Sequence, residues 1–209
     1  LIKQPPDAFT SNSSELEEVV RQYSPKNDKL WEIIRNQFLL PRDYIYVNTG
    51  GLGASPVAVL EDVQHNMYQA EIRPNPGHDL ERWNRVKDKC AGIFSRNCQM
   101  KEIALTSSTT EGNNIVMNGL PLERGDEVIT STHEHAGLNI PLLNKMQRDG
   151  IVLRTFEPDL RNGLNNVNRI EDLITNQTRL IFISHVTCTT GQRFPVREIC
   201  QLARDKGIW

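Results

Sequence analysis

The spacing of apolar residues changes near residue 100, from broad helical faces to short apolar runs that alternate with helices. Before that point, apolar residues recur at helical spacing, as Leu80, Trp83 and Val86 do in one segment. This pattern predicts helices over residues 14–23, 27–38, 56–72 and 79–96. Asn27 is the expected N-cap of the second helix, and Ser55 with Pro56 suits the start of the third. The segment 73–77 (RPNPG) is expected to end that third helix.

After residue 100, short β-branched and aromatic runs predict strands over residues 102–107, 127–131, 151–157 and 179–186. Helices are expected between and after them, over residues 110–120, 136–148, 168–175 and 196–206. Strands and helices that alternate at this spacing predict an α/β fold with a mostly parallel sheet and helices on both faces. YIYVN (44–48) also has the character of a strand, and the glycine-rich turn 49–56 follows it.

The expected organisation is an N-terminal arm with helices over residues 1–40 and one large domain over residues 41–209. Residues 1–14 are rich in polar residues, proline and serine, as is typical of an arm on a surface. Residues 207–209 have the character of the first residues of a further strand. The large domain is therefore expected to be truncated at its C-terminal end.

Charge and cysteine content restrict the possible partners and compartment. The formal net charge of −2 argues against a nucleic-acid partner, which calls for a basic excess. No apolar run approaches the ~18 residues needed to cross a bilayer, so no membrane partner is expected. Four cysteines without metal-ligand spacing predict reduced thiols in a cytoplasmic protein. The sequence begins at Leu1, so an upstream export signal that has been removed stays open as an alternative.

The segment 106–114 (TSSTTEGNN) lies between an expected strand and an expected helix. Ser108 and Glu111 have the spacing of a capping box, which predicts that a helix starts there. A helix N-terminus offers free N–H groups and a positive dipole end, and both suit a phosphate. Thr109 and Thr110 add hydroxyl donors, and Gly112 allows close backbone approach. On local grounds alone, an ordinary capped helix without a ligand is the favoured explanation, because capping boxes are common and phosphate sites are few.

Two further polar segments follow expected strands. Thr132 to Ala136 (THEHA) follows the strand at 127–131, and residues 185–191 (HVTCTTG) end the strand at 179–186. Ligands in open α/β sheets bind beyond the carboxyl ends of the strands, so three polar segments at this edge indicate a ligand site. His133 and His135 lack a third ligand at a recognisable spacing, so no metal is expected.

Cys188 with His185 invites interpretation as a nucleophile and its base. The two residues are three apart at a strand end, where their side chains point in different directions. A small polar residue that lines the site is therefore the better interpretation of Cys188.

Taken together and in order, three segments resemble the large domain of the class V aminotransferase fold, a fold type I transferase domain that binds pyridoxal 5′-phosphate. The segments are SSTTEGNN (107–114), HEHAGLN (133–139) and SHVTCTTGQRFPV (184–196). That superfamily includes cysteine desulfurases and isopenicillin N epimerase-like proteins. YIYVNTGGLGASP (44–56) is similar to the first strand and turn of the epimerase-like branch. The resemblance covers residues 40–209.

The resemblance implies roles for particular residues. Thr110, the backbone of Glu111, and Thr109 would hold the cofactor phosphate. His135 matches the histidine that stacks on the pyridine ring, where it can also act as an acid or base near the substrate.

Two further positions are implied in the same way. Gly50 and Gly51 lie where the family lets its backbone approach the substrate. Cys188 occupies a position near the ring hydroxyl at which desulfurases usually have asparagine and the epimerase-like branch often has serine. This departure favours the epimerase-like branch.

The family chemistry also requires a lysine for the Schiff base and an acid against the pyridine nitrogen. The resemblance implies an aspartate a few residues beyond Trp209 and the lysine further on. None of the lysines in this chain is expected beside the three polar segments: Lys3, Lys26, Lys29, Lys87, Lys89, Lys101, Lys145 and Lys206. The chain by itself is therefore expected to lack catalysis. The whole protein is expected to be an epimerase, lyase or desulfurase that acts on an amino acid as a homodimer.

Two other functions are retained as alternatives to an enzyme that binds pyridoxal 5′-phosphate. A strand followed by GGLGASP has the order of a dinucleotide-binding fingerprint, typical of a Rossmann-type NAD-dependent oxidoreductase. Pro56 occupies the third glycine position and no acidic residue ends a second strand about 20 residues on, and both points disagree with that motif. The other alternative is a non-catalytic relative that keeps the fold and binds a partner.

Overall fold

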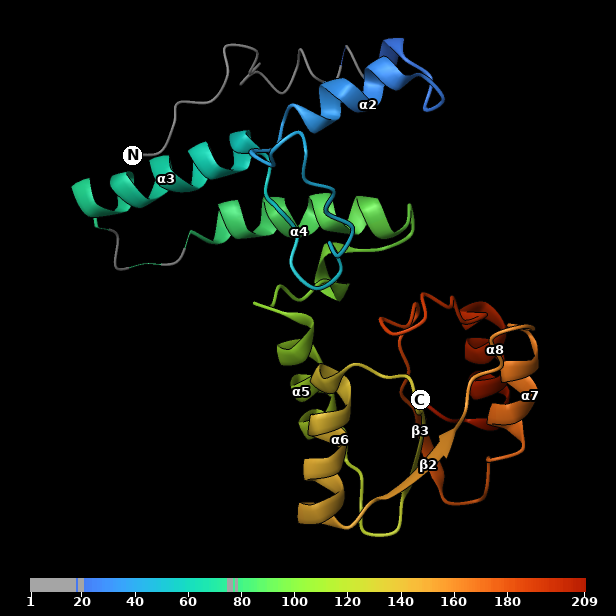
Figure 1. Ribbon diagram of the computed structural model, residues 1–209. Coiled ribbons are helices and arrows are strands. Elements are labelled where there is room, and N and C mark those ends of the chain that lie inside the picture. Colours follow the sequence, from blue (N-terminus) through green and yellow to red (C-terminus); the bar gives the residue numbers. More distant parts are fainter. Residues whose placement is uncertain (1–17, 19–20, 75–76, 78) are drawn as a thin grey trace. The chain divides into compact units, whose positions relative to one another are not determined.

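The computed structural model describes residues 18, 21–74, 77 and 79–209, and the chain divides into two compact units, Leu1–Arg82 and Trp83–Trp209 (Figure 1). The first unit contains helices α2 (Asp28–Arg35) and α3 (Val57–Ile72) and the first residues of α4 (Leu80–Phe94). Asn27 caps α2 as expected, since its side chain accepts from the N–H of Lys29 at 3.0 Å. The predicted helix at 14–23 and the break at 73–77 fall partly outside the described residues. No helix in the described ranges combines the length and the apolar character that a membrane span requires.

The predicted start of α3 was wrong in its detail. Pro56 is the N-cap rather than the first helical residue, and Ser55 makes no capping bond. The first helical N–H, that of Val57, instead donates to the carbonyl oxygen of Gln37 at 2.8 Å. The carbonyl oxygen of Gln37, in the turn after α2, therefore takes the place of the serine cap.

The predicted strand at 44–48 was also wrong, because its backbone is engaged by side chains rather than by another strand. Arg35 donates to the carbonyl oxygens of Pro41 and Tyr44 at 2.8 and 2.9 Å. The hydroxyl of Tyr46 donates to the carbonyl oxygen of Asn48 at 3.1 Å. Val47 is 87% exposed, so the apolar alternation of this segment has no sheet face to cover. The strand that a dinucleotide-binding fingerprint requires before its glycine-rich turn is therefore missing.

The second unit is built on a parallel sheet with the strand order β2–β1–β3. The strands are β1 (Glu127–Ser131), β2 (Val152–Phe156) and β3 (Thr178–Ile181). Both neighbours of β1 run parallel to it, which confirms the predicted sheet. Trp209 continues the pairing beyond β3, since its N–H donates to Arg179 and its carbonyl accepts from Ile181, at 3.0 and 2.8 Å. The expected further strand thus has its first ladder bonds.

Helices cover both faces of this sheet, as predicted (Figure 1). On one face, α5 (Thr109–Gly119) and α6 (Ala136–Asp149) bury a cluster with Val128 of β1, in which Met117 and Leu142 are fully buried. On the other face, α7 (Asn165–Glu171) and α8 (Val196–Lys206) pack around the next residue of β1, Ile129. Successive residues of a strand point to opposite faces, so Val128 and Ile129 each pack against one layer of helices. Burying one such side chain contributes about 1.5–3 kcal/mol.

Two predicted strands differ in the structure. Residues 102–107 form no strand in the described part of the sheet, and the first of them belongs to a short 3₁₀ helix, η1 (Met100–Glu102). Gln99 and Glu102 cap each other there, with the Gln99 N–H on Glu102 Oε2 at 2.8 Å, so the chain turns. Strand β3 ends at Ile181 rather than at 186; the Phe182 N–H still bonds Ile129 of β1, but the Ser184 N–H bonds the Glu134 side chain and Val186 pairs with Arg193 in a turn. Helix α7 begins three residues before the predicted 168, after a loop whose N–H groups are bound by the Asp159 carboxylate.

Candidate cofactor site

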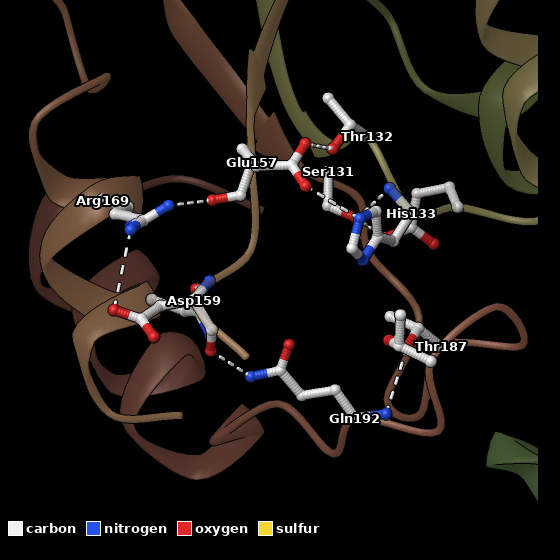
Figure 2. A network of polar contacts seen from close by, with 11 residues as sticks. Ser131, Thr132, His133, Glu157, Asp159, Arg169, Thr187 and Gln192 are labelled. Carbon is white, nitrogen blue, oxygen red and sulfur yellow. Dashed lines mark hydrogen bonds and ion pairs between the residues drawn. The ribbon is translucent and has the colours of Figure 1, made fainter. Parts of the chain in front are cut away.

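Side-chain contacts join the segments that follow the three strands. After β1, Thr132 and His133 both contact Glu157, which follows β2, and the distance from His133 Nε2 to Glu157 Oε1 is 2.9 Å (Figure 2). After β3, the Gln192 amide donates to the carbonyl oxygen of Asp159 (Figure 2). The carboxyl edge of the sheet is therefore closed by contacts between all three connections, which is where the polar segments predicted a site.

A buried glutamate makes the third of these connections. Glu134 is only 6% exposed. Its Oε1 accepts from the Ser131 hydroxyl at 2.6 Å, and its Oε2 accepts from the N–H and hydroxyl of Ser184 at 2.9 and 2.5 Å. Sequence reasoning missed this residue, whose local signal is only its place three residues after a fully buried strand.

His133 is held by the carboxylate of Glu157. Hydrogen bonding from the Thr132 hydroxyl is the main cause that lowers the pKa of Glu157, and the charges of His133 and Arg169 act in the same direction. Arg169 of α7 also donates to the carbonyl oxygen of Glu157 (Figure 2). His133 is thus anchored through Nε2 to the segment that follows β2.

The first turn of α5 keeps several hydrogen-bond donors free. Ser108 is its N-cap and accepts from the N–H of Glu111 at 3.2 Å, so the predicted helix start is confirmed. The Glu111 carboxylate accepts from the N–H and hydroxyl of Ser107 at 2.6 and 2.7 Å, the hydroxyl bond being the larger cause of the lowered pKa of Glu111. Within the described residues, no hydrogen bond uses the backbone N–H or the hydroxyl of Thr109 or Thr110. Four donors at the positive end of a helix remain available to an anion.

His135 is the N-cap of α6, and its imidazole is fixed by the helix that it caps. Its Nδ1 accepts from the N–H of Gly137 at 2.9 Å, so the neutral ring carries its proton on Nε2. The imidazole itself is exposed.

Gly137 brings the starts of α5 and α6 together. A Cβ built at Gly137 would collide with Thr110 Oγ1 and would lie 3.1 Å from His135 Nδ1. Asn113 of α5 also donates to the Gly137 carbonyl oxygen at 3.0 Å. The structure therefore places Thr110 and His135 against the same residue.

Cys188 lies in an exposed turn after β3. The hydroxyls of Thr187 and Thr190 are 2.7 Å apart, the N–H of Thr187 donates to the Gln192 carbonyl oxygen at 3.0 Å, and Gly191 takes a positive φ of 67°. Cys188 is a free thiol, and no hydrogen bond joins it to His185 among the described contacts. The position of Cys188 as a residue that lines the site stays a prediction.

The remaining residues that were expected at the site belong to the first unit. Gly50 and Gly51 belong to a turn of the first unit, in which the N–H of Gly51 donates to the carbonyl oxygen of Asn48 at 3.2 Å. In the part of the chain that the structure describes, no cluster of three or more His, Cys, Asp or Glu side chains is placed to hold a metal ion.

Gly137→Ala is expected to destabilise the protein more when Thr110 is present than when Thr110 is replaced by alanine. The added methyl forces Thr110 out of its rotamer or moves α5 from α6. We expect a coupling free energy of about 1–2 kcal/mol between Gly137→Ala and Thr110→Ala, as for residues in direct contact. Urea unfolding of the two single variants, the double variant and the parent measures it. The contact with His135 is common to both backgrounds and cancels, so strictly additive effects would contradict the close approach.

Comparison with known proteins agrees with this architecture. The family described as aminotransferase class-V matches residues 75–209. A probable cysteine desulfurase of Methanothermobacter thermautotrophicus is 29% identical over 184 residues, which cover 84% of this chain and 44% of that protein. The isopenicillin N epimerase of Streptomyces clavuligerus is 29% identical over 186 residues, 85% of this chain and 46% of the epimerase. The chain thus spans less than half the length of these relatives.

Solved structures show the same fold. A variant of C-DES with glycine covalently linked to its pyridoxal phosphate cofactor matches with a TM-score of 0.67 and 25% identity, over 82% of this chain and 46% of that chain. The cysteine desulfurase CsdA of Escherichia coli matches with a TM-score of 0.67 and 23% identity, over 84% and 46%. The family match covers more than half of the chain and the parallel sheet agrees with it. The chain therefore belongs to the class-V aminotransferase family.

Proposed function

We propose that this chain is the cofactor-binding part of a pyridoxal 5′-phosphate enzyme that acts on an amino acid, in the epimerase, lyase or desulfurase branch of its family. One observation supports the proposal: the helix start that offers the unused donors of Thr109 and Thr110 places the Thr110 hydroxyl against Gly137, which also contacts the imidazole of His135. A phosphate needs the donors, and a flat heteroaromatic ring attached to it needs a planar partner nearby.

The residues present fit this cofactor. The N–H groups and hydroxyls of Thr109 and Thr110 would hold the phosphate. The N–H of Glu111, which already donates to Ser108, could take part only by sharing its hydrogen. The Glu111 carboxylate accepts hydrogen bonds from Ser107 and not from Thr109 or Thr110. The donors of the two threonines therefore stay free for the phosphate.

His135 would stack on the pyridine ring and hold or move a proton at Nε2, because its Nδ1 is committed to the Gly137 N–H. Cys188 would line the ring edge, and Gly50 and Gly51 would let the substrate approach the backbone. When bound, the cofactor supplies an electron sink for a bond broken at the substrate Cα.

The lysine that binds the cofactor and the acid at its ring nitrogen would lie beyond Trp209. The proposed protein is a cytoplasmic homodimer.

Absorbance tests this proposal. The purified whole protein is expected to be yellow, with a band near ~410–430 nm that borohydride removes by reducing the lysine linkage. A protein that takes up pyridoxal 5′-phosphate without such a band would be the non-catalytic relative. A colourless protein that does not bind the cofactor would overturn the proposal.

A further inference from the structure

Glu134 is a buried carboxylate that joins the segment after β1, which carries His135, to the segment after β3, which carries Cys188. It precedes His135 in sequence, and its side chain reaches Ser184, fifty residues on, at the start of the segment that carries Cys188. Its side chain is directed into the edge of the sheet, whereas its neighbour His135 is exposed.

The hydrogen bonds of Glu134 act on both segments at once. One carboxylate oxygen accepts from Ser131 at the end of β1, and the other accepts twice from Ser184 after β3. The Ser184 N–H, three residues after the end of β3, therefore bonds a side chain rather than another strand. A buried N–H that loses its acceptor costs about 1–3 kcal/mol, and Ser184 is partly buried, so the position of Ser184 depends on the carboxylate.

The backbone of Glu134 fixes the start of α6 in turn. Its carbonyl oxygen accepts from the Asn139 side chain at 3.1 Å, and the His135 carbonyl oxygen accepts from the N–H groups of Leu138 and Asn139 at 2.9 and 3.0 Å. The imidazole of His135 is therefore held by the Gly137 N–H, and the backbone that carries it follows directly on the anchored Glu134. Groups that act on a cofactor need such support, because small displacements of the acting group are costly.

We propose that Glu134 is a positioning residue, which acts through its bonds to Ser131 and Ser184 to set the His135 imidazole and the segment 184–191 relative to each other. The role assigned to His135 rests on the proposed function, whereas the anchoring of the two segments does not. Glu134 touches neither the ring nor the substrate in this scheme.

The test compares Glu134→Ala with Glu134→Gln, which keeps the shape and can still accept from Ser184 while donating to Ser131. The matched control is Glu127→Ala. It removes a buried carboxylate from the amino end of β1, whereas Glu134 follows the carboxyl end of that strand. Three properties are measured on the whole protein: amide hydrogen exchange, the NMR titration of the His135 imidazole without cofactor, and visible circular dichroism after addition of pyridoxal 5′-phosphate.

In Glu134→Ala, exchange at Gly137 and within 184–191 is expected to accelerate at least ~10-fold. The His135 titration should shift, and the visible dichroic band should weaken at saturating cofactor. Glu134→Gln should restore all three, and Glu127→Ala should change none of them at a temperature where both variants are folded. Should Glu134→Ala fail to fold, Ser184→Ala, which removes only the hydroxyl bond, should give smaller shifts in the same direction.

Unchanged exchange, titration and dichroism in Glu134→Ala would overturn the proposal, and so would equal changes in Glu127→Ala, which mean general loosening. If the parent protein binds no cofactor, the proposed function fails, while exchange and the His135 titration still judge the anchoring role.

Discussion

Thr110→Val is expected to weaken binding of pyridoxal 5′-phosphate about 10–100-fold. Valine keeps the shape and β-branching of threonine, so α5 and its contact with Gly137 are preserved. The substitution removes one hydroxyl donor that no protein group uses among the described residues. A hydrogen bond to a charged group is worth about 1.5–3 kcal/mol, and 1.4 kcal/mol corresponds to tenfold in affinity. Equilibrium titration of the apo-protein, followed by visible absorbance, measures the change.

Pyridoxal, which lacks the phosphate, is the matched ligand. Its affinity should be the same in Thr110→Val and in the parent, because the hydroxyl is proposed to contact only the phosphate. Thr110→Ser keeps the donor and should bind pyridoxal 5′-phosphate within about threefold of the parent, a difference below 1 kcal/mol. Equal weakening of both ligands in Thr110→Val would place the residue at the ring or in the fold, and the phosphate assignment would be wrong.

Local signals predicted the elements that border the site. Strand β1 has the predicted bounds because every one of its residues is buried, so its apolar and β-branched run reflects a central strand. The start of α5 was predicted by Ser108 and Glu111, two residues that bond within one turn. Signals that depend only on neighbours in sequence can be read without knowledge of the fold.

The errors arose where distant partners decide. Residues 44–48 have the alternation of a strand, but the Arg35 side chain donates to the carbonyl oxygen of Tyr44. Residues 182–186 were predicted to continue β3, but there the Ser184 N–H bonds Glu134 rather than a neighbouring strand. The role of Glu134 could not be predicted either, since its partner lies fifty residues away and the sequence does not state the register of β1 against β3.

Glu127, at the amino end of β1, holds the sheet together far from the proposed site, and its loss is expected to be the most damaging change to stability. It is 4% exposed. Arg154 of β2 donates twice to its Oε1, at 2.9 and 2.6 Å, and the hydroxyls of Thr175 and Thr178 donate to its Oε2 at 2.6 and 3.2 Å. One carboxylate therefore binds both neighbours of the central strand.

Glu127→Ala should lower the free energy of unfolding by about 2–3 kcal/mol at pH 7. Breaking a buried ion pair costs about 3–5 kcal/mol, and the lower figure applies because Arg154 is 45% exposed and can turn to solvent. Urea unfolding measures the loss. Glu127→Gln should lose about 1 kcal/mol, since the amide still accepts from Arg154 and the threonine hydroxyls can turn to accept from its NH₂ group.

The pH dependence of the Glu127 variants separates charge from packing. Burial alone would raise the pKa of Glu127, but hydrogen bonds from Arg154 and Thr175, the Arg154 charge and Thr178 outweigh it and hold that pKa below its usual range. A carboxyl whose pKa is depressed by folding stabilises fully above the unfolded pKa of about 4.3 and loses that contribution as pH falls through the folded pKa. The stability gap between the parent and Glu127→Gln should therefore be constant from pH 7 to about 5 and should shrink below about pH 4. A gap that stays constant into the acid range would mean that the carboxylate charge does not hold β1 to its neighbours, and shape and packing alone would have to account for the loss in Glu127→Ala.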